Sequence, residues 1–154
     1  LGAFLHDIGH LISIHDNEFG QSDRLMVFQN DSLNGLGLVN HENIGADFLE
    51  LMGFPKSVSG LGRNHVLAKR YLITRNADYL NNLSDASKET FKLQGGVLTE
   101  EEVAQFESET DYLVFLRMRY WDDMAKDTNF NYKHNIDFYR DMAIKLLVTK
   151  NNIV

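Results

Sequence analysis

Apolar residues recur along most of the chain at spacings of three and four, which is the pattern of helices with one buried face. Few runs of β-branched residues and a single proline support the same interpretation. The predicted fold class is therefore all-α. We predict helices over about residues 1–14, 41–53, 55–61, 63–78, 84–94, 100–108, 110–126 and 134–149.

Local signals mark several of the predicted helix ends. Gly53 is expected to end one helix, and Pro55 is expected in the first turn of the next. Thr99 with Glu102 three residues later has the spacing of a capping box. Residues 16–40 are rich in Asp, Asn, Ser and Gly and predict a long loop, and loops of this length are often functional.

Length and hydropathy indicate one domain. The 154 residues contain no internal repeat or linker and are enough to form a hydrophobic core. No apolar run approaches the length of a membrane span, and no secretory signal is visible, which favours a cytoplasmic location. Because the sequence begins with Leu inside an apolar segment, we expect that preceding sequence is missing.

Composition narrows the chemistry that the chain can support. The chain has no cysteine, so a disulfide framework and thiolate metal sites are excluded, and His and carboxylate remain as metal ligands. The formal charge of −7 argues against nucleic acid as a partner, because a phosphate backbone needs a basic surface. An anionic small molecule is compatible with this charge if a few cations converge locally.

The most informative short motif is His6-Asp7, followed by His10, inside the apolar N-terminal stretch. Burying an imidazole beside a carboxylate costs free energy unless both have partners, and metal ions are common partners. His15-Asp16 repeats the dipeptide in a polar setting, and we interpret that copy as surface.

Three more candidate ligands lie further along the chain. His41, His65 and Asp122 each stand near an apolar helical stripe. Imidazole nitrogens and carboxylate oxygens suit Fe, Mn, Zn or Ni, and one carboxylate can bridge two metal ions. Taken singly, each of these residues is more often a capped or partly exposed group than a ligand.

A second set of residues could bind an anion. Ser87, Thr90 and Gln94 share one face of a predicted helix, and Lys69 lies one turn after His65. The alternative for the three neutral residues is a solvated helix face.

Arg119 would add a second cation, three residues before Asp122. Two cations and three neutral hydrogen-bonding groups beside a metal would suit a phosphate or phosphonate. The alternative is that Arg119 forms a structural salt bridge with Asp122 or Asp123.

The order of His6-Asp7, His41, His65 and Asp122 resembles the H…HD…H…D pattern of the HD-domain superfamily. More narrowly, several segments resemble the PhnZ-type mixed-valent di-iron 1-hydroxyphosphonate dioxygenases, which are related to myo-inositol oxygenase. These segments are residues 41–47, 65–71, 83–96 and 119–122. The resemblance extends from residue 1 to about residue 127.

This resemblance implies an HD-domain helical bundle, with residues 1–154 forming a single HD domain. It also implies an enzyme with two iron ions, Fe(II) and Fe(III), and O2 as co-substrate. The expected reaction cleaves the C–P bond of an organophosphonate, a 1-hydroxyalkylphosphonate such as 2-amino-1-hydroxyethylphosphonate, into phosphate and a carboxylate. The expected partner is thus a small molecule, with no nucleic acid and no membrane.

The resemblance also assigns roles to individual residues. Iron would be bound by His6, His41, His65 and Asp122, with Asp7 bridging the two ions. The substrate would be contacted by His10, Lys69, Ser87, Thr90, Gln94 and Arg119. The catalytic residues would be Asp7 and His10.

The chain departs from the family pattern at its start. In the family, a first histidine ligand and a tyrosine/glutamate lid precede the His-Asp dipeptide, and this sequence contains neither. We therefore expect an HD domain that lacks its N-terminal helix or helices. Three alternatives stay open: an HD phosphohydrolase acting on a nucleotide or phosphomonoester, a non-catalytic phosphonate-binding HD module, and a structural helical protein with unrelated, locally satisfied histidines.

Overall fold

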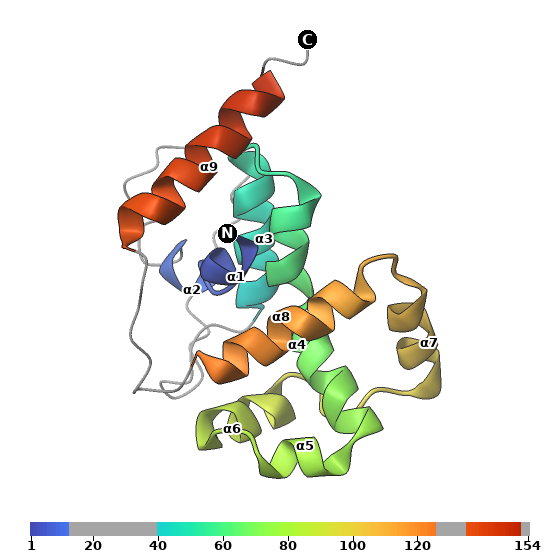
Figure 1. Cartoon of the computed structure of the whole chain (residues 1–154). Helices are drawn as coiled ribbons and strands as arrows, with labels where there is room; N and C mark the ends of the chain where they lie inside the picture. Colours follow the sequence, from blue (N-terminus) through green and yellow to red (C-terminus); the bar gives the residue numbers. More distant parts are fainter. Residues whose placement is uncertain (13–39, 126–134, 152–154) are drawn as a thin grey trace.

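The computed structural model describes residues 1–12, 40–125 and 135–151, and these residues form helices without any strand (Figure 1). The predicted all-α class is thus confirmed for this part of the chain. The 16–40 loop, apart from residue 40, and the His15-Asp16 copy lie outside the described residues. The helices are α1 (Gly2–Leu5), α2 (Gly9–Ile12), α3 (His41–Leu51), α4 (Lys56–Arg75), α5 (Ala77–Asn81), α6 (Asp85–Leu93), α7 (Glu100–Ser108), α8 (Tyr112–Met124) and α9 (Ile136–Asn151).

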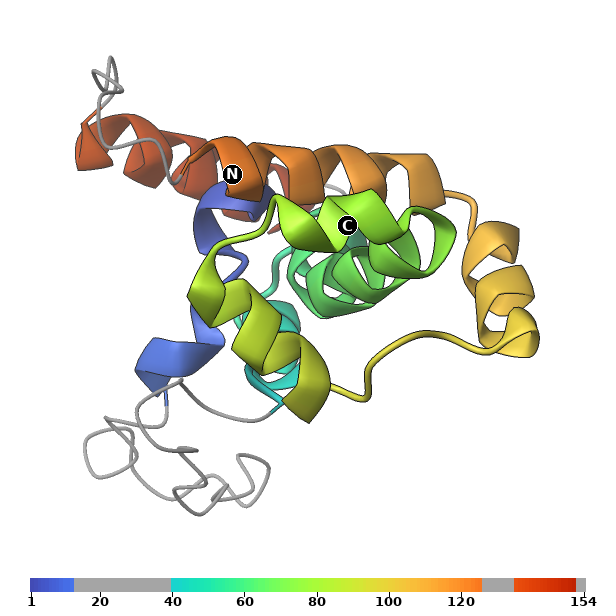
Figure 2. The same ribbon diagram turned by 90° about the horizontal axis from the view of Figure 1, so that it is seen from below.

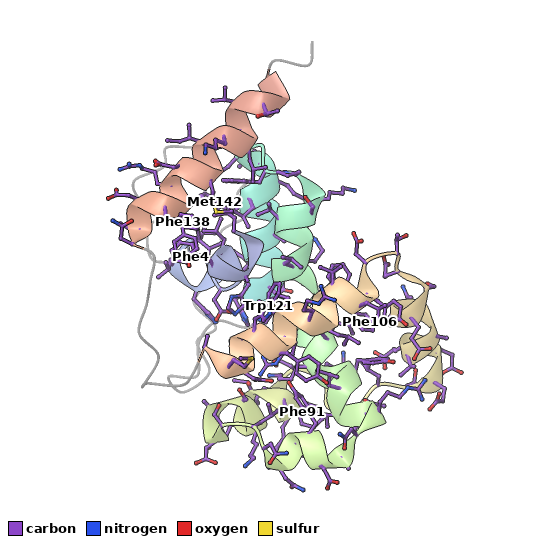
Figure 3. The ribbon with its side chains drawn as sticks, viewed as in Figure 1. Phe4, Phe91, Phe106, Trp121, Phe138 and Met142 are labelled. Atoms are coloured by element: carbon purple, nitrogen blue, oxygen red, sulfur yellow. The ribbon has the colours of Figure 1, made fainter. Side chains whose placement is uncertain are left out.

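Helix α4 is the centre of the fold, and α1, α3, α5 and α8 all pack against it. One core cluster joins α4, α7 and α8 through Ala68, Phe106 and Phe115. A second cluster lies under α5 and α6 and contains Ile73 and Phe91, with Phe91 and Phe106 both visible in Figure 3. Helix α9 lies at the other end of the molecule from α5 and α6 and contacts α1, where Phe4 stacks on a tyrosine ring with centroids 4.0 Å apart.

The predicted helix over residues 1–14 is wrong, because the structure has two short helices separated by a turn at residues 6–8. Helix α1 packs on α4, whereas α2 packs on α3, and one straight helix could not make both contacts. Figure 2 shows α1 beside α8 and α2 displaced toward α3. The turn between them places His6 and Asp7 where the two short helices meet.

The predicted break near residue 62 is also wrong, because α4 runs without interruption from Lys56 to Arg75. Gly62 lies inside this helix against the backbone of His6, where an added Cβ would come within 3.3 Å of the His6 carbonyl oxygen. Gly62 therefore provides a close approach rather than a helix end. The same helix ends at Arg75 rather than at residue 78, because Asn76 caps α5 by accepting a hydrogen bond from the Asp78 amide.

Other predicted boundaries are close to those observed. Thr99 and Glu102 form the expected capping box, with hydrogen bonds of 3.2 and 2.8 Å between each side chain and the other residue's amide. Gly53 follows the end of α3 with φ of +92°, a conformation that suits glycine. Pro55 is the N-cap of α4 rather than a residue of its first turn. None of the helices in the described ranges combines the length and the apolar character that a membrane span requires.

Candidate metal centre

Four elements bring the predicted ligands together: the turn between α1 and α2, and helices α3, α4 and α8, of which α8 carries Asp122. The turn between α1 and α2 supplies His6 and Asp7, the first residue of α3 is His41, and the middle of α4 supplies His65. The Nε2 atoms of His41 and His65 lie 3.1 Å apart, and Asp7 Oδ1 lies 3.4 Å from each of them. Residues 24 or more positions apart in the chain therefore share one small volume.

His6 and Asp122 complete this arrangement. His6 Nε2 lies 3.2 Å from Asp7 Oδ2 and 3.6 Å from Asp122 Oδ1. This nitrogen is buried and has no hydrogen-bond partner among the described residues. A buried nitrogen that faces two carboxylate oxygens without a hydrogen bond is suited to a bound cation.

Backbone carbonyl groups fix the tautomers of two of these imidazoles. His6 Nδ1 donates to the carbonyl oxygen of Ala3 at 2.7 Å, and His65 Nδ1 donates to that of Gly62 at 2.6 Å. Because each Nδ1 is bonded to a carbonyl oxygen, Nε2 is the ring nitrogen directed toward the other ligands. A second ring nitrogen held in this way is typical of metal-binding histidines. The donor set therefore fits a transition metal with nitrogen and oxygen ligands.

Two groups of side chains could each hold a metal ion, and they share Asp7. One group contains His6, Asp7 and His65, and the other contains Asp7, His10 and His41, with ligand atoms all within 4.8 Å of one another in each group. His10 stacks on His41 with ring centroids 3.9 Å apart. The Asp7 side chain remains about half exposed, at 52%, so solvent and small molecules can reach the centre. One carboxylate common to two groups is the arrangement that a bridged pair of metal ions requires.

The electrostatics of the centre favour a cation. Partial burial opposes ionisation of Asp7, but the neighbouring imidazoles of His41 and His6 outweigh it and hold the Asp7 pKa far below its usual range. Burial works against the charged form of His6, yet the nearby carboxylates of Asp122 and Asp7 raise its pKa to about 10. Burial lowers the pKa of His65 to about 3, so this imidazole is neutral at pH 7 and can act as a ligand.

The predicted anion-binding residues lie on two helices, with Lys69 one turn after His65 on α4, and Ser87, Thr90 and Gln94 on α6 or at its C-cap. Lys69, 3% exposed, donates from Nζ to Thr90 Oγ1 of α6 at 2.9 Å. Ser87 is buried, and Ser84 donates a hydrogen bond to its hydroxyl at 3.1 Å. Gln94 Oε1 is buried without a hydrogen-bond partner among the described residues. The solvated-face alternative for this part of α6 is therefore wrong, because the face packs toward a buried lysine.

Arg119 forms the salt bridge that the sequence left open, and it forms it with both carboxylates. Its guanidinium donates from Nη1 to Asp122 Oδ2 at 2.6 Å and from Nη2 to Asp123, while Nε donates to the hydroxyl of Tyr79 at 3.1 Å. Burial opposes the charge of Arg119, but Asp122, Tyr79 and Asp123 outweigh it and raise its pKa. The expected contact between Arg119 and a phosphonate stays a prediction.

Several residues of this region carry no role in the sequence-based set. Tyr79 donates a hydrogen bond to Asp123, and Arg70 donates to the carbonyl oxygen of Gly96 at 2.9 Å. Glu42 Oε2 lies 3.5 Å from His41 Nδ1 and is buried. Adjacency to His41 could have pointed to Glu42, whereas the 40-residue separation of Tyr79 from Arg119 leaves no sequence signal.

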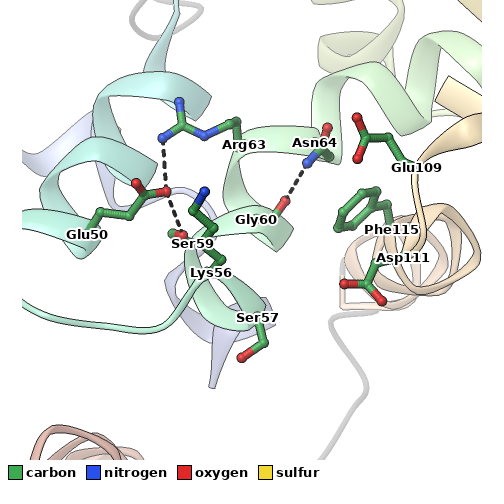
Figure 4. A pocket seen from close by; sticks show the side chains of 10 residues that line it. All are labelled: Glu50, Lys56, Ser57, Ser59, Gly60, Arg63, Asn64, Glu109, Asp111 and Phe115. Atoms are coloured by element: carbon green, nitrogen blue, oxygen red, sulfur yellow. Dashed lines mark hydrogen bonds and ion pairs between the residues drawn. The ribbon is translucent and has the colours of Figure 1, made fainter. Parts of the chain in front are cut away.

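A polar pocket of about 470 Å³ opens on another face of α4 (Figure 4). Gly60, Arg63 and Asn64 line it, and these positions point away from the face that carries His65 and Lys69. Arg63 is already engaged by carboxylates of α3, at 2.6 and 3.2 Å. The pocket is thus separate from the candidate metal centre.

Curated proteins with similar sequences define the class of this chain. Over all 154 residues it is 38% identical to the uncharacterized protein L432 of Acanthamoeba polyphaga mimivirus, of which it covers 64%. It is 40% identical over 126 residues, 82% of its length, to the [1-hydroxy-2-(trimethylamino)ethyl]phosphonate dioxygenase (glycine-betaine-forming) of Leisingera caerulea, of which it covers 57%. It is 41% identical over 127 residues, 80% of its length, to the hydroxymethylphosphonate dioxygenase of Gimesia maris, of which it covers 55%. No family model matches the chain.

The described residues are all-helical, and the homologues of the chain are HD-domain dioxygenases. More narrowly, the chain is homologous to the PhnZ-type 1-hydroxyphosphonate dioxygenases, and the resemblance predicted from the motifs is confirmed. The chain spans a little more than half the length of the two dioxygenases it matches. The homologues are phosphonate dioxygenases, and the His and Asp clusters described above are consistent with a metal site in this chain.

Proposed function

We propose that the protein is an iron-dependent oxygenase that cleaves the C–P bond of a 1-hydroxyalkylphosphonate with O2, giving phosphate and a carboxylate. The observation that carries this proposal is the position of Asp7, whose carboxylate is common to two groups able to hold a metal ion. Dioxygenase activity toward hydroxyphosphonates in two homologues supports the same reaction. 2-Amino-1-hydroxyethylphosphonate is one substrate that fits this class.

In this proposal, two iron ions are held by His6, Asp7, His41, His65 and Asp122. When bound, the metal pair would supply Lewis acidity toward the substrate hydroxyl and the redox chemistry of O2 activation. The protein contributes the ligand geometry, because backbone carbonyl groups direct Nε2 of His6 and His65 inward. The partial exposure of Asp7 leaves an approach for the substrate.

The anionic end of the substrate would lie against Lys69 and the polar face of α6. Lys69 is buried and donates a hydrogen bond to Thr90, so its charge is poorly screened by water and would attract a phosphonate oxygen. Gln94 would donate its amide NH2 to the same oxygens. Lys69 would also stabilise the negative charge that develops as phosphate departs. This stabilisation would contribute more to the rate than the binding of the substrate by Lys69 does.

His10 would handle a proton at the C1 hydroxyl of the substrate. It belongs to the group that contains Asp7 and His41, so it is close to the expected position of the hydroxyl. Partial burial and the neighbouring His41 lower the pKa of His10, so the neutral ring can accept a hydrogen bond at pH 7.

The cytoplasmic location expected from the sequence stays a prediction.

The decisive experiment measures phosphate release from 2-amino-1-hydroxyethylphosphonate in air and under argon, together with O2 consumption and iron content. We expect one O2 consumed for each phosphate released, and no release under argon. Phosphate release from a phosphomonoester under argon would instead identify an HD phosphohydrolase. Binding of the phosphonate by iron-free protein, without turnover in either gas, would identify a binding module.

The variant Lys69→Ala separates substrate binding from metal binding. Removing the buried ammonium leaves the phosphonate without its charge partner, so KM is expected to rise by at least about tenfold, equivalent to the ~1.5–3 kcal/mol of a charge-assisted hydrogen bond. Iron content is expected to stay at the wild-type level, because Lys69 is not one of the proposed iron ligands. Loss of iron in this variant would contradict the assigned role.

A further inference from the structure

Three partners surround the guanidinium of Arg119 and hold it in one orientation. Its side chain is 4% exposed, and each of its three nitrogens donates a hydrogen bond: to the hydroxyl of Tyr79, to Asp122 and to Asp123. Tyr79 in turn donates its own hydrogen to Asp123. Arg119, Tyr79 and Asp123 therefore form a closed ring of hydrogen bonds, which we call the Arg119 clamp.

The clamp is anchored on two separate parts of the fold. Arg119 and Asp123 belong to α8, while Tyr79 belongs to α5 and packs against the core cluster of Ile73, Leu83 and Phe91. The ring of Tyr79 is partly buried, so its hydroxyl has little freedom to move. A planar guanidinium held at three edges loses most of its conformational freedom before any ligand binds.

This fixed guanidinium decides which oxygen of Asp122 faces the metal centre. Arg119 Nη1 donates a hydrogen bond to Asp122 Oδ2 at 2.6 Å. The other carboxylate oxygen of Asp122, Oδ1, then faces His6 Nε2 at 3.6 Å. Because rotation of the carboxylate would break the short hydrogen bond to Arg119, the orientation of Asp122 depends on Arg119. We propose that Tyr79 and Asp123 are positioning residues that hold Arg119, and through it Asp122, in the orientation for metal binding.

This inference rests on the proposed role of Asp122 as an iron ligand, which belongs to the proposed function. Partners of a ligand outside the first coordination sphere typically contribute 10–100-fold in metal affinity or activity. A positioning role affects iron binding by the folded protein, whereas a purely structural role affects only the stability of the fold. Loss of the Tyr79 hydroxyl should weaken iron binding by the folded protein, beyond any effect on the unfolding temperature.

The test compares Tyr79→Phe with Tyr120→Phe. Tyr120 is a matched control, because it is 51% exposed and its ring meets that of Tyr79 edge to face, with centroids 6.3 Å apart, without being part of the clamp. Fe(II) is titrated anaerobically into each metal-free protein against a competing chelator, well below the unfolding temperature. We expect about tenfold weaker iron binding in Tyr79→Phe and less than a twofold change in Tyr120→Phe.

Asp123→Asn is the second variant, in case Tyr79→Phe does not fold. It keeps the size of the side chain and removes the charge that balances Arg119, and we expect about tenfold weaker iron binding. Asp123→Glu should recover part of the affinity. Iron binding within twofold of wild type in both folded variants overturns the inference, and so does a wild-type protein that binds no iron.

The same titrations separate this inference from the proposed function. If iron binding weakens in the variants but wild-type protein releases no phosphate from the hydroxyphosphonate, the positioning role stands and the proposed reaction fails. If wild-type protein is an active oxygenase and the variants bind iron normally, the reaction stands and the positioning role fails.

Discussion

Replacing Gly9 with alanine tests whether close packing of two helices builds the metal centre. Gly9 is the first residue of α2, and its Cα lies against the backbone of α3. An added Cβ would overlap the carbonyl oxygen of His41 and come within 2.8 Å of its carbonyl carbon and 2.9 Å of the Gly45 amide nitrogen. All three are backbone atoms, so no side-chain rotation can relieve the overlap.

The size of the effect follows from this geometry. Contacts shorter than 3.0 Å essentially never occur for real Cβ atoms, so α2 and α3 must move apart by about 1 Å or more. Overpacking of this kind costs ~1–3 kcal/mol, and the rigid partner favours the upper end. The better helix propensity of alanine returns about 0.5–1 kcal/mol. We therefore expect Gly9→Ala to lower the free energy of unfolding by about 2 kcal/mol.

The same displacement should affect the ligands. Asp7 precedes Gly9 by two residues, and its Oδ1 lies 3.4 Å from His41 Nε2 across the contact that must open. Iron binding is therefore expected to weaken by about tenfold or more, as for other changes that misplace a ligand. Chemical denaturation of the metal-free protein measures the first effect, and competitive Fe(II) titration measures the second.

Gly60→Ala is the control for this prediction. Gly60 lies within α4, and its added Cβ would meet the ring of Phe115 at 3.7 Å, an ordinary contact. Alanine there should raise the free energy of unfolding by about 0.5–1 kcal/mol and leave iron binding unchanged. A Gly9→Ala protein with wild-type stability and wild-type iron affinity would refute the packing argument.

Three further predictions concern a metal ligand, the segment after α6 that contains Gln94 and Gly96, and pH. Asp7→Asn should weaken iron binding by more than the ~10–100-fold typical of outer-shell changes, because both candidate metal groups include Asp7; full iron retention by elemental analysis would contradict this. Arg70→Met removes the hydrogen bond to the Gly96 carbonyl, so the nearby Gln94 should lose its fixed position. KM for the phosphonate should then rise several-fold while iron content stays normal. An unchanged KM would contradict a role of Arg70 in holding Gln94. His65 should contribute a loss of about 2 kcal/mol of stability to the metal-free protein between pH 7 and pH 5, because the unfolded chain, with a histidine pKa near 6.5, takes up a proton that folded His65, with a pKa of about 3, does not. Denaturation curves of wild type and His65→Gln at the two pH values isolate this contribution, and an equal change in both proteins excludes His65 as its cause.

The sequence alone determined those features that depend on nearby residues or on side-chain chemistry. Spacings of three and four residues predicted the helical class, because one turn of helix brings such positions onto one face. The capping box of Thr99 and Glu102 was equally predictable, since both partners lie within one turn. The absence of cysteine left His and carboxylate as ligand types, and the order of the His and Asp residues resembled a family to which homology is now shown.

Only the tertiary structure decided how these residues meet. The N-terminal segment breaks into two helices because α1 and α2 pack on different partners, and no local pattern records that choice. Gly62, where the sequence predicted a helix break, instead lets the backbone of His6 approach α4 closely, although His6 is far away in the sequence. Arg119 is held by Tyr79 from a different helix, 40 residues away. Such contacts depend on the distances between packed backbones, which the order of residue types does not specify.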